Sequence, residues 1–218
     1  MAEGQDVSAV IINFRTPDLT LRAVRSLRSC YETLPLLLID NGSRDSSEAL
    51  LRASAGGSTE LLLNARNIHH GPAMDQALRH LTSAFVLFLD SDIEMLQAGF
   101  VERMRTALLD QPQAYAIGKR IWMNHRGFDV PENADGQPYI RPICMLLRRN
   151  VYFTLPPFER HGAPCLSNMR EASRRGLHLL DFPVEEFIRH RGRGTAARHG
   201  YRLGVRGKLN HLLNRLGL

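Results

Sequence analysis

Two aspartates, Asp90 and Asp92, directly follow the apolar run FVLFL and are separated by Ser91 alone. In an extended segment, side chains two residues apart point the same way, so both carboxylates can reach one point in space. A divalent cation bound between the carboxylates is the simplest way to offset their repulsion. Oxygen ligands suit Mg²⁺ or Mn²⁺, and a substrate phosphate could complete the coordination shell. The alternative is a helix cap by Ser91 or Asp92, with Glu94 in the first turn of the helix.

Polar residues also close two earlier apolar runs. The run VSAVIIN ends in Asn13, and PLLLID ends in Asp40, which is followed by Asn41-Gly42-Ser43. Ligands of open parallel sheets bind at the carboxyl ends of the strands, so these residues and the aspartate pair are expected to form one rim. Ordinary polar turns are the alternative, and Asn-Gly favours a turn.

The elements that must position this rim follow from hydrophobic patterning. Four nearly continuous apolar runs, typical of parallel strands covered on both faces, lie at residues 7–13, 35–40, 59–64 and 84–90. Helices are predicted from the cap at Thr16-Pro17-Asp18, weakly over 43–53, from Gly71-Pro72, and over about 96–109. This alternation predicts an α/β fold with an open, mostly parallel sheet flanked by helices.

The pattern loosens after residue 110. Strands are predicted at 114–123 and 139–147, a loop at 156–165, a helix from there to about 175, and one or two strands within 177–190. A loop at 191–195 and a short basic helix over 203–216 complete the chain. A length of 218 residues favours a single domain.

Composition narrows the class of protein. The net charge is +6, yet residues 189–218 hold eight Lys or Arg and no acid, so this tail could contact an anionic membrane surface or simply dock on the domain. No transmembrane run or signal peptide is expected, and three scattered cysteines favour a reduced, cytoplasmic setting, with peripheral contact at the inner face of a membrane as an option. An aromatic content of 7% and the lack of a recognised motif argue against nucleic acid as a partner.

Four segments, in this order and spacing, carry a family resemblance. They are VSAVIINFRTPDLTLRAVRSL, LLLIDNGSRDSS, NIHHGPAMDQAL and FVLFLDSDIEM, and together they resemble the nucleotide-sugar-binding half of family 2 glycosyltransferases, which have the GT-A fold. The resemblance implies one GT-A domain over residues 1–218. In it, residues 1–110 bind the nucleotide sugar, 111–190 face the acceptor, and 191–218 form a basic loop and C-terminal helix.

The resemblance also implies roles for single residues. Asp40 would hydrogen-bond the base, Gly71 would let the backbone approach the nucleotide, and Asp75 stands where many members carry asparagine. Asp92 would bind the metal directly, and His190 matches a late histidine that serves as a further metal ligand, although a lone histidine is otherwise a solvent or core residue. The implied nucleotide-binding set is Ile12, Asn13, Asp40, Asn41, Gly71, Asp75, Asp90 and Ser91, and the implied metal set is Asp90, Asp92 and His190.

The second half departs from the family pattern. Inverting members usually carry an acid pair about twelve residues before a glycine, and counting back from Gly176 lands on Pro164-Cys165. The remaining candidates for the base that deprotonates the acceptor are Glu159, His161 and Glu171, of which His161 titrates near neutrality. A retaining mechanism, or a protein that binds without turnover, also fits the missing acid.

These observations predict a metal-dependent glycosyltransferase that uses Mn²⁺ or Mg²⁺. It would move a sugar from a nucleotide-diphospho-sugar to a glycan or lipid-linked acceptor in cell-surface polysaccharide or glycoconjugate synthesis. The alternative is a non-catalytic nucleotide-sugar-binding protein with a degenerate acceptor site. A haloacid-dehalogenase-type phosphatase fits poorly because Glu94 stands where that motif has Thr or Val, and a nucleotidyltransferase fits poorly because no Gly-rich basic loop follows the first strand.

Overall fold

The computed structural model describes residues 6–132, 135–159 and 162–190. His161, the predicted loop at 191–195 and the predicted helix over 203–216 lie outside these residues.

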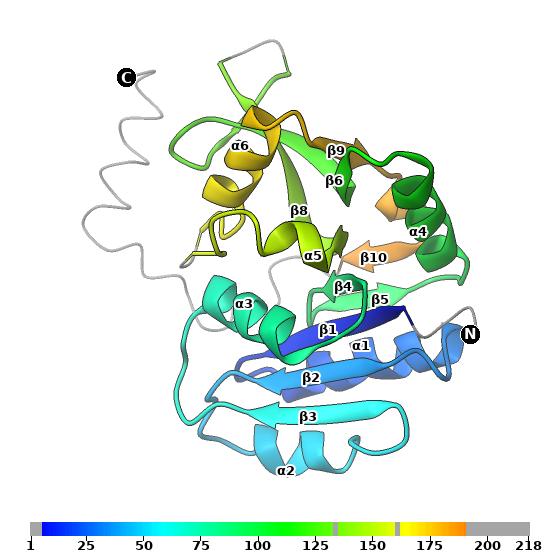
Figure 1. The fold of residues 1–218 in the computed structure, drawn as a ribbon. Helices are drawn as coiled ribbons and strands as arrows, with labels where there is room; N and C mark the ends of the chain where they lie inside the picture. Colours follow the sequence, from blue (N-terminus) through cyan, green and yellow to red (C-terminus); the bar gives the residue numbers. More distant parts are fainter. Residues whose placement is uncertain (1–5, 133–134, 160–161, 191–218) are drawn as a thin grey trace.

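One eight-stranded sheet organises the described residues, in the order β3-β2-β1-β4-β8-β6-β7, with β9 beside β6 (Figure 1). Its first four strands are parallel, and β8 joins antiparallel to both β4 and β6. The bounds are β1 (Val7–Asn13), β2 (Leu36–Asp40), β3 (Thr59–Leu63), β4 (Phe85–Leu89), β6 (Ala114–Met123), β7 (Asp129–Val130), β8 (Gln137–Arg148) and β9 (His178–Asp181).

Helices cover both faces of this sheet. One face packs against α1 (Pro17–Cys30), α2 (Ser47–Arg52) and α4 (Phe100–Asp110), and the other packs against α3 (His70–His80), α5 (Arg149–Tyr152) and α6 (Leu166–Arg174). Among the described helices, none combines the length and the apolar character needed to cross a bilayer.

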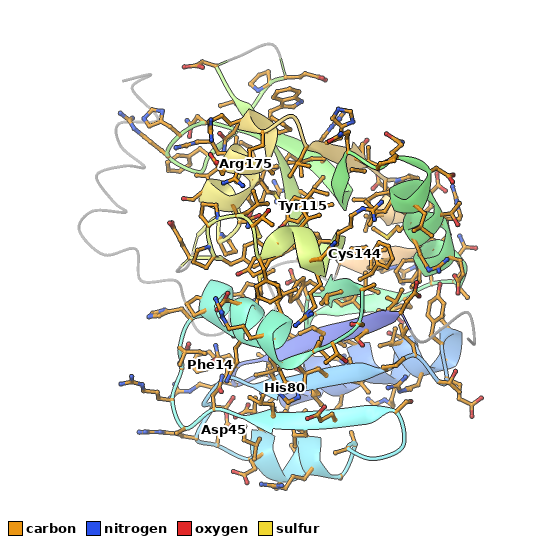
Figure 2. The ribbon with its side chains drawn as sticks, in the orientation of Figure 1. Phe14, Asp45, His80, Tyr115, Cys144 and Arg175 are labelled. Atoms are coloured by element: carbon orange, nitrogen blue, oxygen red, sulfur yellow. The ribbon has the colours of Figure 1, made fainter. Side chains whose placement is uncertain are left out.

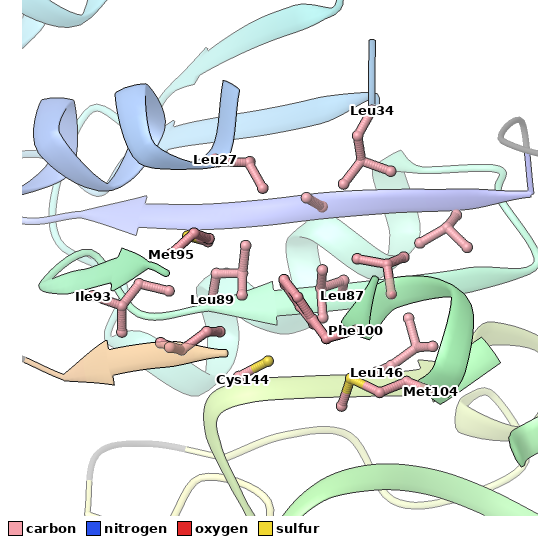
Figure 3. Close-up of a cluster of buried hydrophobic side chains, with 14 of the residues drawn as sticks. Leu27, Leu34, Leu87, Leu89, Ile93, Met95, Phe100, Met104, Cys144 and Leu146 are labelled. Atoms are coloured by element: carbon pink, nitrogen blue, oxygen red, sulfur yellow. The ribbon is translucent and has the colours of Figure 1, made fainter. Parts of the chain in front are cut away.

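The two cores explain why the strands are apolar without a break. Along β1, Ala9 and Ile11 join the core under α1 and α4, while Val10 and Ile12 join the core under α3. Figure 3 shows the first core, in which Leu27 of α1 and Phe100 of α4 lie with residues of β4 and β8. The prediction of an α/β fold with a mostly parallel sheet flanked by helices is therefore confirmed.

The predicted helix over 96–109 is wrong at its start. Residues Ile93–Met95 form a short strand, β5, which pairs antiparallel with β10 (Ile188–His190), and α4 begins only at Phe100 after Gly99 with φ of 94°. The cap interpretation is also wrong, because Ser91 and Asp92 precede a strand and Glu94 lies within it. Pairing with a distant segment overrides the local preference here.

The rest of the second half follows the prediction closely. Two strands, β9 and β10, fall within 177–190, with a short 3₁₀ helix, Val184–Glu186, between them. The strand predicted at 139–147 extends to Gln137–Arg148, and the short elements β7 and α5 were not predicted.

Candidate metal and nucleotide site

Asp90, Asp92 and His190 meet at the carboxyl end of β4. The Nε2 atom of His190 lies 3.2 Å from Oδ1 of Asp92 and 3.9 Å from Oδ2 of Asp90. One ligand atom from each of the three residues lies within 4.8 Å of the others, which is close enough to share one ion. The β5–β10 pairing makes this possible, because it places His190 opposite Ile93, the residue after Asp92.

The electrostatics of the cluster favour a bound cation. Burial and the charge of Asp92 raise the pKa of Asp90 to about 6, although His190 lowers it. A hydrogen bond with Asp92 raises the pKa of His190, and burial of the ring opposes that rise. Without a cation, protons are therefore what relieve the repulsion of the two carboxylates.

The chemistry of the donor set fits the predicted metals. Two carboxylate oxygens and one imidazole nitrogen form a partial shell that leaves positions for substrate or water. The two carboxylates suit both Mg²⁺ and Mn²⁺, and the imidazole is the ligand that suits Mg²⁺ least.

The rim at the ends of β1 and β2 is a buried hydrogen-bond network. Asn13 pairs in register with Asp40, and its Nδ2 donates to Oδ1 of Asp40 at 2.7 Å. Ser43 donates to the same carboxylate twice, from its hydroxyl at 2.5 Å and from its backbone N–H at 3.1 Å, and Thr20 donates to Asn13 at 2.8 Å. These four residues are at most 4% exposed, so the carboxylate is fixed in place by the fold.

The sequence interpretation placed Ser43 in the polar rim but gave it no role, and it missed Thr20. The spacing of Ser43 from Asp40 is a turn signal that the chain did offer, because a side-chain oxygen of Asp commonly accepts from a backbone N–H in the following turn. Thr20 lies on α1 and gave no signal, because only the packing of α1 on β1 brings it to Asn13.

Asn41 fixes the segment that leads from β3 into α3. Its Oδ1 accepts from Nδ2 of Asn64 and from the backbone N–H of Ile68, while its Nδ2 donates to Asn67 and to the carbonyl of His69. Gly42 must be glycine, because a Cβ there would lie 2.2 Å from the backbone carbon of Arg66 and its φ is +72°. Ile12 belongs to the core under α3.

Unusual backbone conformations gather at the same edge. Arg15, Arg44 and His69 have φ values of 58°, 55° and 73°, and they follow the ends of β1, β2 and β3. Figure 2 labels Phe14 and Asp45 at this edge, and these are the sequence neighbours of Arg15 and Arg44. Left-handed residues other than glycine are sparse and cluster at functional sites, so their gathering here supports a built site.

The structure shows contacts for Gly71 and Asp75 that the sequence interpretation did not foresee. A Cβ on Gly71 would lie 1.5 Å from the carbonyl oxygen of Glu159, so the glycine makes room for another stretch of backbone. Asp75 accepts a hydrogen bond of 2.6 Å from the hydroxyl of Tyr152, which itself accepts from the backbone N–H of Phe158 at 3.1 Å. Both residues therefore hold the segment before Glu159 against α3.

The candidate bases differ in their exposure and in the contacts that set their pKa. Glu159 is exposed and follows the segment held against α3, whereas His161 lies outside the described residues. Hydrogen bonds from Arg174 and Arg175 lower the pKa of Glu171 to about 2, which makes it a poor base. Cys165 is fully buried and burial raises the pKa of its thiol, so this residue packs the core.

The sequence profile of glycosyl transferase family 2 matches residues 8–164. No curated protein sequence matches the chain. The solved structures that resemble it include the mannosyltransferase PcManGT from Pyrobaculum calidifontis in complex with GDP-Man and Mn²⁺, with a TM-score of 0.71 and 15% identity over 98% of this chain.

Two further structures resemble the chain. GalNAc-T7 with UDP, GalNAc and Mn²⁺ has a TM-score of 0.68 and 12% identity over 84% of this chain. Glucosyl-3-phosphoglycerate synthase from Mycobacterium tuberculosis, in complex with phosphoglyceric acid, has a TM-score of 0.61 and 19% identity over 99% of this chain. The chain spans 64%, 43% and 81% of these three proteins in turn. At these identities the likeness shows the fold, which is GT-A.

Proposed function

Because this chain belongs to glycosyl transferase family 2, we propose that it transfers a sugar from a nucleotide-diphospho-sugar to a hydroxyl of an acceptor with the help of a divalent cation. The cluster of Asp90, Asp92 and His190 at the carboxyl edge of the sheet is the observation that carries this proposal. The mannosyltransferase bound to GDP-Man and Mn²⁺ and GalNAc-T7 bound to UDP and Mn²⁺ support both the donor class and the metal.

The donor side is assigned to residues at the ends of β1, β2 and β4. Asp90, Asp92 and His190 would hold Mn²⁺ or Mg²⁺, and the bound ion supplies positive charge beside the diphosphate that leaves. Asp40, fixed by Asn13 and Ser43, offers a hydrogen-bond acceptor to an N–H of the base. Ile12, Asn41, Gly71, Asp75 and Ser91 stay predictions as nucleotide-binding residues.

The acceptor side is assigned to the segment that contains Glu159. In the proposed reaction a base takes the proton of the acceptor hydroxyl, whose oxygen then attacks the anomeric carbon as the bond to the diphosphate breaks. Glu159 is the candidate base within the described residues, and His161 is the second candidate. A glycan or lipid-linked acceptor, and a role in cell-surface polysaccharide synthesis, stay predictions from the family.

The basic tail belongs to the same proposal. Residues 191–218 contain Arg and Lys without any acid, and peripheral contact with an anionic bilayer is the proposed role. Flotation of the full chain with anionic liposomes, compared with a chain ending at residue 199, tests this role, because equal flotation of the two would contradict it.

Calorimetric titration with UDP-, GDP- and dTDP-sugars tests the donor assignment. The wild-type protein is expected to bind at least one donor in the presence of Mn²⁺ and to lose that binding when the metal is removed or when Asp92 is changed to Ala. Asp110→Ala is the matched control, because Asp110 is an exposed carboxylate at the end of α4. If no nucleotide sugar binds to the wild-type protein with Mn²⁺, the proposal is wrong.

Binding without catalysis is the second candidate function. It is favoured by one observation: Cys165, at the position where the family usually has its acid, is buried and packs the core. Release of the nucleoside diphosphate during incubation with the bound donor separates the two functions, because a non-catalytic binder releases none above the rate in buffer.

A further inference from the structure

Strand β8 carries a bulge beside the cluster of Asp90, Asp92 and His190. Its pairing with β6 matches Met145 with Gly118 and Ile140 with Arg120, so residues 141–144 of β8 stand opposite Lys119 alone. Gly118 permits this irregularity, because a Cβ there would lie 2.5 Å from the carbonyl oxygen of Cys144. Bulges bend a strand and re-aim its side chains, and they are common next to active sites.

The bulged segment runs along the end of β4. Cys144 pairs with Leu89, and the next backbone N–H, that of Asp90, donates to the carbonyl of Ile143 at 3.0 Å. This bond places Ile143 beside Asp90, and Arg141 lies two residues further along β8.

Arg141 has an ion pair that another anion can replace. Its guanidinium contacts the carboxylate of Asp129 on β7, and the two side chains are 39% and 56% exposed. Ion pairs at this exposure contribute little to the stability of a fold. A guanidinium also presents two parallel N–H groups that match the oxygens of a phosphate.

The charges at the site leave a need for a further positive group such as this guanidinium. One divalent cation offsets the two carboxylates of Asp90 and Asp92, and this leaves the charge of a bound diphosphate uncompensated. Arg189 on β10 already has a partner. It lies opposite Glu94 in the β5–β10 pair, and its guanidinium is 3.9 Å from the Glu94 carboxylate.

We propose that Arg141 binds phosphate oxygens of the nucleoside diphosphate at the Asp90–Asp92–His190 site, in exchange for its contact with Asp129. This inference rests on the proposed donor class. It adds a positively charged residue from the acceptor half of the chain to the diphosphate pocket.

Calorimetry with UDP, GDP and dTDP in the presence of Mn²⁺ tests the inference. Arg141→Gln is expected to raise the Kd of the best-bound diphosphate by about tenfold or more, as the loss of a charge-assisted pair implies. Arg141→Lys should recover part of that loss, because lysine keeps the charge without the fork. Arg170→Gln is the control, since Arg170 is an exposed arginine on α6 that bonds to Gln137.

Four further readouts separate binding of the diphosphate from other roles. The Kd of the matching nucleoside, which lacks phosphate, should be the same in wild type and Arg141→Gln. Affinity for Mn²⁺ alone and the melting temperature should not fall, and this excludes a variant that is merely unfolded. If instead an anionic group of the acceptor is what Arg141 binds, transfer falls while the Kd of the diphosphate stays at its wild-type value, and the inference is overturned.

The wild-type titration distinguishes a failure of the proposed function from a failure of the Arg141 inference. Absence of any diphosphate binding to the wild-type protein overturns the proposed function together with this inference. Normal wild-type binding that persists unchanged in Arg141→Gln overturns the Arg141 inference alone.

Discussion

His190 Nε2 lies 3.2 Å from Oδ1 of Asp92, and the pairing of β5 with β10 is what brings these two residues together. The contact joins the end of the described chain to the Asp-X-Asp segment near its middle. It converts two repelling carboxylates into a three-residue cluster of metal-binding type at the carboxyl edge of the sheet.

Loss of any cluster residue should weaken metal binding. Asp92→Ala is expected to lower the affinity for Mn²⁺ by more than about 100-fold, since even outer-shell partners of metal ligands contribute about 10- to 100-fold. Free Mn²⁺ measured by electron paramagnetic resonance during titration checks this. Asp110→Ala should bind as the wild type does, and retention of wild-type affinity by Asp92→Ala would remove Asp92 from the site.

Metal affinity should fall as the pH falls. Binding requires deprotonated Asp90 and His190, whose pKa values are raised to about 6 and above the usual 6.5, so protons compete with the metal below neutrality. Calorimetry in buffers of different ionisation enthalpy should detect protons released on Mn²⁺ binding near neutral pH. Binding that is independent of pH between about 5 and 8 would contradict the assigned ligands.

The stability of the metal-free protein should show the opposite trend at this cluster. A raised folded-state pKa stabilises the fold below the unfolded-state value and loses that contribution as the pH rises through the folded-state value. For Asp90 the window runs from its ordinary value of 3.8 to about 6. Asp90→Asn should flatten the decline of melting temperature across this window, and an unchanged slope would show that Asp90 does not titrate as described.

The fixed carboxylate of Asp40 depends on Asn13. Asn13→Ala removes a donor from Asp40 and an acceptor from Thr20 in a buried network. The free energy of unfolding should fall by about 1–3 kcal/mol, because buried polar groups lose their partners. Urea denaturation measures the change, and Thr20→Val, which removes one bond of the same network, should cost less.

Gly71→Ala should be poorly tolerated. The added Cβ meets the backbone carbonyl of Glu159 at 1.5 Å, so α3 and the segment before Glu159 must separate, at a cost of about 2–3 kcal/mol. Gly136→Ala is the matched control, because its nearest atom, at 2.5 Å, is a methyl group of the Val130 side chain and not a backbone atom. Equal melting temperatures for the two variants would contradict the close approach at Gly71.

The strands of residues 1–110 could be predicted from the sequence because short local patterns indicate them. The runs at 7–13 and 84–90 are apolar throughout since both faces of their strands are covered, and the polar residues that end them mark the rim. His190 was indicated by family resemblance alone. Nothing local in its surroundings shows that residues 188–190 pair with 93–95.

The parts that escaped prediction depend on contacts between distant segments. The cap interpretation put Glu94 in the first turn of a helix, yet its pairing with Arg189 places it in a strand. The contact of Asp75 with Tyr152 arises from the packing of α5 on α3, and the bulge at residues 141–144 arises from the pairing of β8 with β6. Residue types and spacing alone cannot specify such contacts.

A crystal of the protein grown with Mn²⁺ and the best-bound nucleoside diphosphate tests the central claim most directly. The anomalous signal of manganese is expected as one peak bound by carboxylate oxygens of Asp90 and Asp92 and by Nε2 of His190, with diphosphate oxygens on its open side. A peak at any other place, or a bound diphosphate without a metal between it and Asp92, would contradict the claim that this cluster is the donor site.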